Sequence, residues 1–332
     1  MSYICCDALN IAGRPSPFDL WDAGTDGVRL VAFDNGAFID YHGHLRASDL
    51  ETAVVIARES CANDDFGGWA SFYAEHIAPT YWVLGNEMDA YLLEAESPSS
   101  WKMRPEEYAA FWHATAVPIL QRQPDALLVV GGLVSGQPSY LEETFPLLDP
   151  RPYAVDVHPY GRDAASAEDL LWMYRSLALP AAQARLRLYR EVLATYGMNE
   201  RRLFVLEWNR PDHEISEYER MLQEETGQAA WFCWSDLMVS PFGLLDADDQ
   251  QKPEYDAFQT ANGGGPVADL HPEIKKTMQE FEQAGGTVGT VYTITDLANG
   301  QIANTDAGLF LWQQNVPGAQ ILLDARAKNP FR

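Results

Sequence analysis

The feature that most constrains the fold of this chain is a series of eight short apolar runs, most of them separated by stretches with helical periodicity. Most of the runs are continuously apolar rather than alternating, which is typical of parallel strands that are covered on their outer side. The runs are Tyr3–Leu9, Gly27–Phe33, Ala53–Ala57, Tyr81–Gly85, Ala126–Gly131, Tyr153–His158, Arg202–Leu206 and Ala229–Trp234. Eight strands alternating with helices over roughly 260 residues predict an α/β fold of the (β/α)8 TIM-barrel class.

Helical patterns lie between several of the runs and support this fold. They cover Gly68–Ala78, Arg104–Gln123, Leu179–Tyr196 and Ile215–Thr226. The structural alternative is a doubly wound open sheet, which predicts a glycine-rich phosphate loop after the first strand. Residues 7–10 read Asp-Ala-Leu-Asn, which is not such a loop, so the barrel is favoured.

The character of the sequence changes near residue 262. Residues 261–266 read Ala-Asn-Gly-Gly-Gly-Pro, which is typical of a linker. A helix is predicted at Pro272–Ala284, followed by short strands at Thr287–Thr295, Gly308–Gln313 and Ala319–Leu323. We therefore expect a barrel over residues 1–262 and a small C-terminal α+β region of unknown role over residues 263–332. This region either packs on the barrel or serves as an interaction module.

Charge and composition argue against several classes of partner. The formal net charge is −25, whereas binding to nucleic acid or to an anionic membrane needs a basic surface. No apolar run approaches the roughly 18 residues of a membrane span, and the N-terminus lacks the features of a signal peptide. We expect a protein that is cytoplasmic, mature after cleavage, or released by a non-classical route such as lysis. The sequence indicates no particular oligomeric state.

The four cysteines, at positions 5, 6, 61 and 233, do not have the spacing of a zinc site. Cys5 and Cys233 lie in apolar runs, so we expect buried thiols rather than disulfides. The chain also lacks a phosphate loop, a nucleophilic serine motif and a cluster of metal ligands. No cofactor and no metal are therefore expected.

Two of the apolar runs end in a glutamate, and this pair is the strongest indication of chemistry. Glu87 ends the segment at residues 81–87, and Glu207 lies in the segment at residues 203–209. In a parallel barrel, catalytic groups sit at the C-terminal ends of the strands, where the fourth and seventh strands lie across the barrel mouth. Two carboxylates facing each other there are the minimum equipment for cutting a glycosidic bond.

These segments resemble motifs of the clan A glycoside hydrolases. Asn86-Glu87 after an apolar strand is similar to the acid/base motif of the clan, and Glu207 before Trp208-Asn209 is similar to its nucleophile. Three further motifs match on the second, sixth and eighth strands: Arg29, His158-Pro159-Tyr160-Gly161 and Trp234. Within the clan, the glutamate segments look most like family 39 and its relatives. The resemblance covers roughly residues 1–262.

The resemblance implies a role for each matched residue. Glu87 would act as the acid/base, Glu207 as the nucleophile, and Asn86 as a hydrogen-bonding partner of the 2-hydroxyl of the sugar. Trp234 would form the floor of the −1 sugar site. The other matched residues would support the nucleophile and line the active-site cleft: Arg29, His158 and Tyr160. The chain departs from the clan directly after the acid/base, where Met88-Asp89 replaces the more usual proline.

Several other side chains have simpler interpretations. Arg29 needs a buried partner because an unpaired buried charge is very costly, and we expect Glu207 to be that partner. Trp82 and Trp208 are expected to pack in the core. Asp212-His213-Glu214 follows the seventh strand on the same rim and is a weak candidate for a sugar subsite.

The rim of the barrel is predicted to carry long segments that can form subsites for a polysaccharide. They are residues 34–50, 89–104, 134–140, 161–178 and 236–252. His42 and His44 fall in the first of them, which we interpret as a solvated loop rather than as a metal-binding His-x-His pair.

The sequence therefore predicts a retaining glycoside hydrolase that cleaves a β-linked oligo- or polysaccharide by double displacement through a glycosyl-enzyme. Retention needs two carboxyl groups about 5–5.5 Å apart, with protonation states that their surroundings keep different. Three alternatives stay open. One is a barrel that binds carbohydrate without cutting it, and the second is a transglycosylase on the same scaffold. The third is an interaction protein in which the acidic surface and the C-terminal region matter most.

Overall fold

We analysed a computed structural model of the whole chain. The residues that it describes are 2–6, 15, 20, 23–32, 36–48, 50–92, 102–160, 176–209, 215–233, 235–236, 243–248, 250–262, 274, 276–277, 291–297, 300–305, 308–313 and 319–321.

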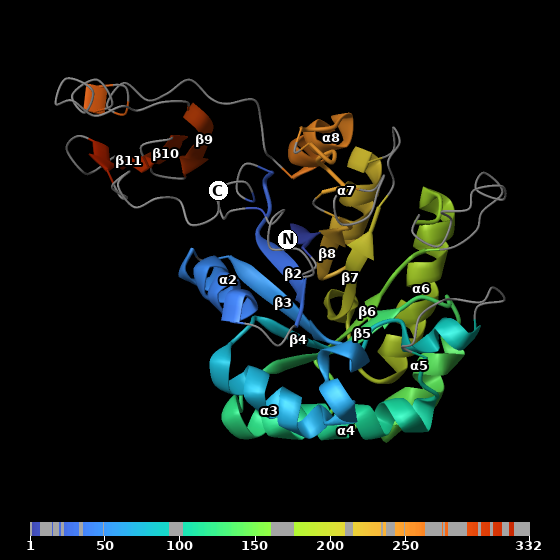
Figure 1. Cartoon of the computed structure of the whole chain (residues 1–332). Helices are drawn as coiled ribbons and strands as arrows, with labels where there is room; N and C mark the ends of the chain where they lie inside the picture. The colour runs from blue at the N-terminus through green and yellow to red at the C-terminus, as the bar shows by residue number, and fades with distance from the viewer. Residues whose placement is uncertain are drawn as a thin grey trace.

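Eight parallel strands close into a barrel, in which each strand pairs with the next and β1 pairs with β8. The strands are β1 (Ser2–Cys5), β2 (Gly27–Val31), β3 (Glu51–Ile56), β4 (Tyr81–Leu84), β5 (Leu127–Leu133), β6 (Ala154–Val157), β7 (Leu203–Trp208) and β8 (Gln228–Trp231). Each of them overlaps one of the predicted apolar runs, so the predicted (β/α)8 TIM barrel is confirmed (Figure 1).

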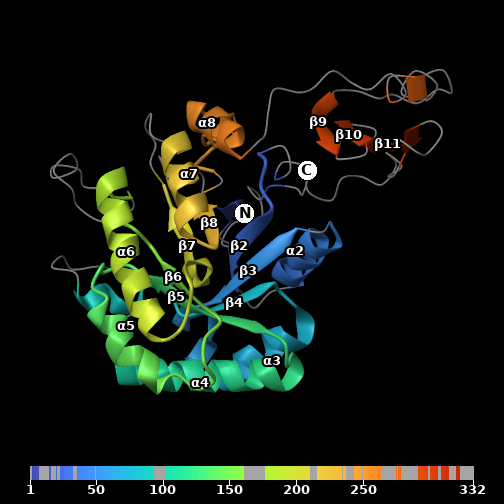
Figure 2. The ribbon, with the colours of Figure 1, turned by 180° about the vertical axis from the view of Figure 1, so that it is seen from behind.

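Helices cover the outside of the barrel, as Figures 1 and 2 show from two sides. They are α2 (Gly36–Ala47), α3 (Phe66–His76), α4 (Pro105–Arg122), α5 (Ser139–Thr144), α6 (Leu179–Thr195), α7 (Ile215–Glu225) and α8 (Pro253–Ala261). Among the described residues, no helix combines the length and the apolar character needed to cross a membrane.

Helix α2 corrects the interpretation of residues 34–50 as a solvated rim loop. Phe38, Tyr41, His42 and Leu45 are spaced at three and four residues, and all four are buried. The His42 ring lies against Thr52 Oγ1 of β3 at 3.1 Å, while His44 is exposed on the helix. Burial, with a contribution from the charge of Arg46, lowers the pKa of His42 to about 4. The imidazole is therefore a neutral core group, and residues 36–47 form a packed helix rather than a solvated loop.

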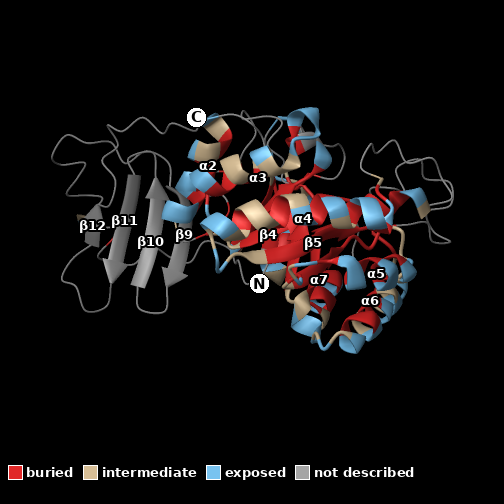
Figure 3. Ribbon diagram, turned by 90° about the horizontal axis from the view of Figure 1, so that it is seen from below, coloured by how far each residue is buried: buried red, intermediate tan, exposed pale blue. Residues whose placement is uncertain are grey.

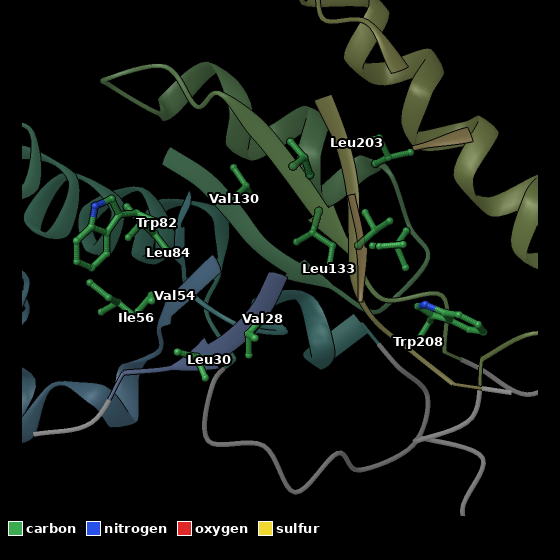
Figure 4. Packing of buried hydrophobic residues seen from close by; sticks show 14 of the residues in the cluster. Val28, Leu30, Val54, Ile56, Trp82, Leu84, Val130, Leu133, Leu203 and Trp208 are labelled. Atoms are coloured by element: carbon green, nitrogen blue, oxygen red, sulfur yellow. The ribbon is translucent and has the colours of Figure 1, made fainter. Parts of the chain in front are cut away.

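The core has two layers, and the alternation of side chains along each strand separates them. The inner layer fills the barrel and includes Ala53, Val83 and Phe204. The outer layer lies between the strands and the helices, and Figure 4 shows residues of it such as Val54, Trp82 and Trp208. Both tryptophans are fully buried in it, as predicted. Figure 3 shows the buried strands enclosed by helices whose outer faces are exposed.

All four cysteines are buried thiols, as expected, and none of these described residues is in a disulfide. Cys5 belongs to β1 and Cys233 follows β8, so two of the thiols lie where the barrel closes. The apolar runs that contain Cys5 and Cys233 thus predict the buried environment of these two thiols.

The C-terminal region contains a four-stranded antiparallel sheet in the order β12-β11-β10-β9. Its strands are β9 (Val291–Leu297), β10 (Gly300–Thr305), β11 (Gly308–Gln313) and β12 (Ala319–Ile321). The three predicted strands correspond to β9, β11 and β12, while β10 was not predicted. Most of the predicted helix at Pro272–Ala284 lies outside the described residues, and the three of its residues that are described are helical. The division of the chain at residue 262 stays a prediction.

Candidate active site

The predicted site residues come together at the C-terminal ends of four barrel strands. Arg29 lies in β2, Glu87 follows β4, His158 directly follows β6, and Glu207 lies near the end of β7. Asn86 and Tyr160 join them through contacts with Arg29 and with Glu207. Trp234 and the candidate segment Asp212-His213-Glu214 lie outside the described residues.

An irregularity in β7 turns Glu207 toward the other site residues. Leu203 and Val205 belong to the outer layer, and Phe204 and Leu206 belong to the inner one, as strict alternation requires. Continued alternation would point Glu207 outward. The register between β7 and β8 shifts between Val205 and Trp208, however, and Trp208 takes the outward position. Bulges of this kind re-aim side chains next to active sites.

Glu87 lies on a backbone that is held in an uncommon conformation. Its φ is 51°, which is in the left-handed region, where a residue other than glycine carries a strain on the order of 1–3 kcal/mol. Its N–H donates to Gly132 O of β5 at 2.7 Å, and its carbonyl accepts from Ala90 N at 3.0 Å. Gly131 permits this close approach, because a Cβ there would lie 1.8 Å from Gly85 O. The chain therefore fixes the position of Glu87 through its backbone.

Arg29 connects Glu207 to two other strand ends. Its Nη2 pairs with Glu207 Oε1 at 2.6 Å and donates to Asn86 Oδ1 at 2.9 Å. Its Nη1 donates to Cys5 Sγ at 3.1 Å. The predicted Arg29–Glu207 pair is thus confirmed. A cation this deeply buried would be very costly without an anion, so the pair keeps Glu207 in its carboxylate form.

His158 lies between the two glutamates. Its Nδ1 is 3.2 Å from Glu87 Oε1 and 3.5 Å from Glu207 Oε2. The Tyr160 hydroxyl donates to Glu207 Oε2 at 3.5 Å. Burial, together with the charges of Glu207 and Glu87, raises the pKa of Tyr160 well above its ordinary value, so the phenol stays a donor. The arrangement therefore gives Glu207 a hydrogen bond from Tyr160 and the nearby charge of His158 in addition to Arg29.

The surroundings of His158 favour its protonated form. Complete burial by itself lowers the pKa of the imidazole, but the charges of Glu207 and Asp156 and hydrogen bonds to Asp156 and Glu87 outweigh burial and raise it to about 10. Asp156 was not among the predicted site residues, although it is fully buried and lies 3.3 Å from His158 Nε2. Its position two residues before His158 on a strand is the sequence signal that places it on the same side.

The two glutamates differ in exposure. The side chain of Glu87 is 20% exposed, whereas that of Glu207 is 9% exposed. Glu87 is thus the carboxyl group that solvent and a departing group reach more easily, while Glu207 is enclosed by its partners.

Glu87, His158 and Glu207 also form a group of possible metal ligands. They are the one such cluster found among the described residues, and each offers an atom within 4.8 Å of the atoms of the other two. Histidine binds a metal ion as the neutral imidazole, however. The neighbouring carboxylates raise the pKa of His158 to about 10, so its charge at neutral pH favours hydrogen bonds over coordination.

Solved structures share the fold of this chain, whereas no protein-family model and no curated protein matches it. A glucosidase from Croceicoccus marinus aligns with a TM-score of 0.56 and 14% identity, over 77% of this chain and 66% of that one. GH5_18 from Streptomyces cattleya, in complex with GlcNAc, aligns with a TM-score of 0.54 and 13% identity, over 78% and 79% of the two chains. The exo-β-1,4-mannosidase Op5Man5 from Opitutaceae bacterium strain TAV5 gives 0.50 and 14%, over 78% and 59%. This chain therefore spans just under two thirds of the glucosidase, and at such identities the likeness shows the barrel fold.

Proposed function

We propose that the protein is a retaining glycoside hydrolase that cleaves a β-linked glycan. The observation that carries the proposal is the approach of the two strand-end carboxylates, which have oxygen atoms within 4.8 Å of each other. Retaining enzymes hold their two carboxyl groups about 5–5.5 Å apart, whereas inverting enzymes need about 6.5–9.5 Å to admit a water molecule. The separation between Glu87 and Glu207 supports the retaining arrangement.

In the first step, a carboxylate oxygen of Glu207 attacks the anomeric carbon, and the bond from that carbon to the leaving oxygen breaks. Glu87 transfers its proton to that oxygen, and the sugar becomes an ester of Glu207. The ion pair with Arg29 supports the role of Glu207 as the nucleophile, because it keeps the carboxylate ionised and oriented. The greater exposure of Glu87 supports its role as the proton donor.

In the second step, Glu87 takes a proton from water, the water oxygen attacks the anomeric carbon, and Glu207 leaves as a carboxylate. The loss of the charge on Glu207 during the first step favours this change of role, because Glu87 no longer has an anion beside it. Asn86 accepts from Arg29 through Oδ1 at 2.9 Å, so its NH2 group is the part that we assign to the sugar 2-hydroxyl. Trp234 keeps its predicted role as the floor of the −1 site.

The assignment to clan A, closest to family 39, rests on the resemblance of residues 81–87 and 207–209 to that clan. The glucosidase, the GH5_18 protein and the mannosidase with the same fold support a glycosidase barrel and do not distinguish families. A glucosidase, a complex with GlcNAc and a mannosidase point to different sugars, so the substrate proposed here is limited to the class of β-linked glycans.

The test is a panel of aryl β-glycosides and β-glycans incubated with the wild type, Glu207→Ala, Glu87→Ala and the control Glu51→Ala. Glu51 is the first residue of β3, at the opposite end of the barrel, where Tyr3 donates a hydrogen bond to it. We expect Glu207→Ala to be inactive and Glu51→Ala to keep the wild-type rate. Glu87→Ala should lose about 10²–10⁴-fold, with a smaller loss for leaving groups that need no protonation.

Azide distinguishes the two glutamates. With Glu207→Ala and an activated aryl β-glycoside, it should restore turnover and give the inverted α-glycosyl azide. With Glu87→Ala, it should give the retained β-glycosyl azide. A wild type that cuts nothing, or a Glu207→Ala variant that cuts as fast as the wild type, would refute the proposal. Products longer than the substrate would instead identify a transglycosylase.

A further inference from the structure

Asp156 is a buried carboxylate that the proposed mechanism does not use. It lies in β6 between Val155 and Val157, which belong to the outer layer, so its side chain points into the barrel with Ala154 and His158. It is fully buried. A buried carboxylate is costly unless hydrogen bonds satisfy it, so its partners show what it stabilises.

Both oxygens of Asp156 contact groups that adjoin Glu207, the proposed nucleophile. Oδ1 accepts the N–H of Leu206 at 2.7 Å, and Leu206 directly precedes Glu207 in the irregular part of β7. Oδ2 lies 3.3 Å from His158 Nε2. The other nitrogen of that ring faces Glu87 and Glu207 at 3.2 and 3.5 Å. One carboxylate therefore holds the strand that carries Glu207 and the ring that touches both glutamates.

The negative charge of Asp156 contributes to the balance of charges around His158. The charged groups that face His158 are Asp156 on its own strand, and Glu87, Glu207 and, through Glu207, Arg29 on the other strand ends. The neutral Tyr160 ring lies against it with the centroids 5.8 Å apart. With His158 protonated, the two cations Arg29 and His158 balance the carboxylates of Asp156 and Glu207. Asp156 therefore supplies one of the two carboxylates that balance the two cations of the site.

We propose that Asp156 is a positioning residue, which holds His158 as a cation that donates to Glu87 and faces Glu207, and which fixes the segment of β7 that bears Glu207. This inference rests on the proposed function for its catalytic meaning. Only the imidazolium carries protons on both nitrogens. A neutral ring keeps a proton on only one nitrogen. It can therefore donate either to Asp156 or toward the glutamates, but not to both.

The test is Asp156→Asn in the full chain, with the ring nitrogens of His158 followed by NMR across pH 6–9 and assigned with His158→Gln. The wild-type ring should stay protonated throughout, because its neighbours raise its pKa to about 10. In Asp156→Asn the ring should titrate within this range. With an aryl β-glycoside, kcat should fall on the order of 10²-fold with little change in KM, since small displacements of catalytic groups cost that much.

The matched control is Ser176→Ala. Ser176 Oγ accepts the N–H of Asn209 at 3.0 Å, so this variant also removes an acceptor from a backbone N–H next to Glu207, here at the residue that directly follows β7. It leaves Asp156 in place, and we expect the His158 titration to stay as in the wild type. If the titration of His158 shifts equally in Asp156→Asn and Ser176→Ala, Asp156 has only a structural role and the proposal is wrong.

Two results overturn the proposal. One is an Asp156→Asn protein with the wild-type titration and the wild-type kcat. The other is a wild-type protein in which His158 is already neutral at pH 8. This measurement uses the wild type alone, so it decides the question even if Asp156→Asn fails to fold. The NMR result does not depend on glycan cleavage, so a wild type that cuts no glycan refutes the proposed function and leaves the Asp156–His158 pairing to be judged separately.

Discussion

One buried histidine should make the stability of this protein fall as the pH rises from 7 to 10. The pKa of His158 is raised from 6.5 to about 10 in the folded protein. Below pH 6.5 the ring is protonated in both the folded and the unfolded chain, so the stabilisation is fully present. Between the two pKa values only the folded chain holds the proton, and each pH unit removes about 1.4 kcal/mol of unfolding free energy. The total loss by pH 10 is on the order of 5 kcal/mol.

The assay is urea unfolding of the wild type and of His158→Gln at pH 6, 7, 8 and 9, followed by tryptophan fluorescence. The stability advantage of the wild type over the variant should shrink by about 1.4 kcal/mol with each pH unit above 6.5. The four cysteines also ionise in the unfolded chain in this range, but they occur in both proteins and cancel in the difference.

His42→Gln is the control with the opposite sign. The pKa of His42 is lowered to about 4 in the folded protein, so the unfolded chain binds the additional proton between pH 4 and 6.5. Its contribution to stability therefore rises over that window and is constant above it, and His42→Gln should keep the wild-type slope from pH 7 to 9. If the difference between wild type and His158→Gln is constant over pH 6.5–9, His158 does not hold its proton and the charge balance argued for the site is wrong.

Three further substitutions test other contacts of the site. Arg29→Met leaves a buried carboxylate without its cation and should lower the unfolding free energy by about 3–5 kcal/mol at pH 7; a loss under about 1 kcal/mol in urea unfolding would contradict the buried pair. Gly132→Ala would place a Cβ 2.1 Å from His158 Nε2, so kcat should fall by about 10²-fold, whereas Gly43→Ala, where a Cβ meets nothing within 4 Å, should keep the wild-type kcat. Asp89→Ala deprives two backbone N–H groups of their acceptor and should cost about 2–6 kcal/mol in thermal or urea unfolding, at the known cost of about 1–3 kcal/mol per unsatisfied group.

The barrel was predictable because its signal is repeated along the chain. Each strand is buried on both sides, so the apolar runs stand out without any knowledge of their neighbours. Helix α2 was missed although Phe38, Tyr41, His42 and Leu45 have helical spacing. Gly43 in its middle disfavours a helix by about 1 kcal/mol, which makes the segment look like a loop. Burial of the four side chains decides the matter, and only the tertiary structure shows where they go.

The site was predictable to the extent that it follows strand ends. Arg29 and His158 lie where the alternation of their strands places them, and Glu87 lies in the turn that follows β4. Glu207 does not, because strict alternation from Leu203 would point it outward with Val205. The register shift that turns it inward depends on pairing with β8, which the local sequence does not encode. Asp156 was overlooked for a different reason, since it lies inside a run that was interpreted as uniformly apolar.

The departure from the motif that this segment resembles, directly after the proposed acid/base, has a physical counterpart in the structure. A proline directly after Glu87 would restrict the backbone, whereas this chain has Met88 and Asp89. The Asp89 carboxylate accepts the N–H groups of Val134 and Ser135 at 2.8 and 2.9 Å, and the Ser135 hydroxyl at 2.5 Å. Burial raises the pKa of Asp89, and these hydrogen bonds act in the opposite direction.

A proline fixes one dihedral angle but does not fix where the turn lies relative to the next strand. Asp89 fixes the position of the turn, because its hydrogen bonds connect the turn to the residues at the end of β5. The same strand accepts the Glu87 N–H at Gly132 O. The strained φ of Glu87 is therefore held from both sides of the residue by β5. It follows that the direction of the proposed acid/base depends on β5 as much as on β4, and that loss of the Asp89 hydrogen bonds should act on proton transfer to the leaving group.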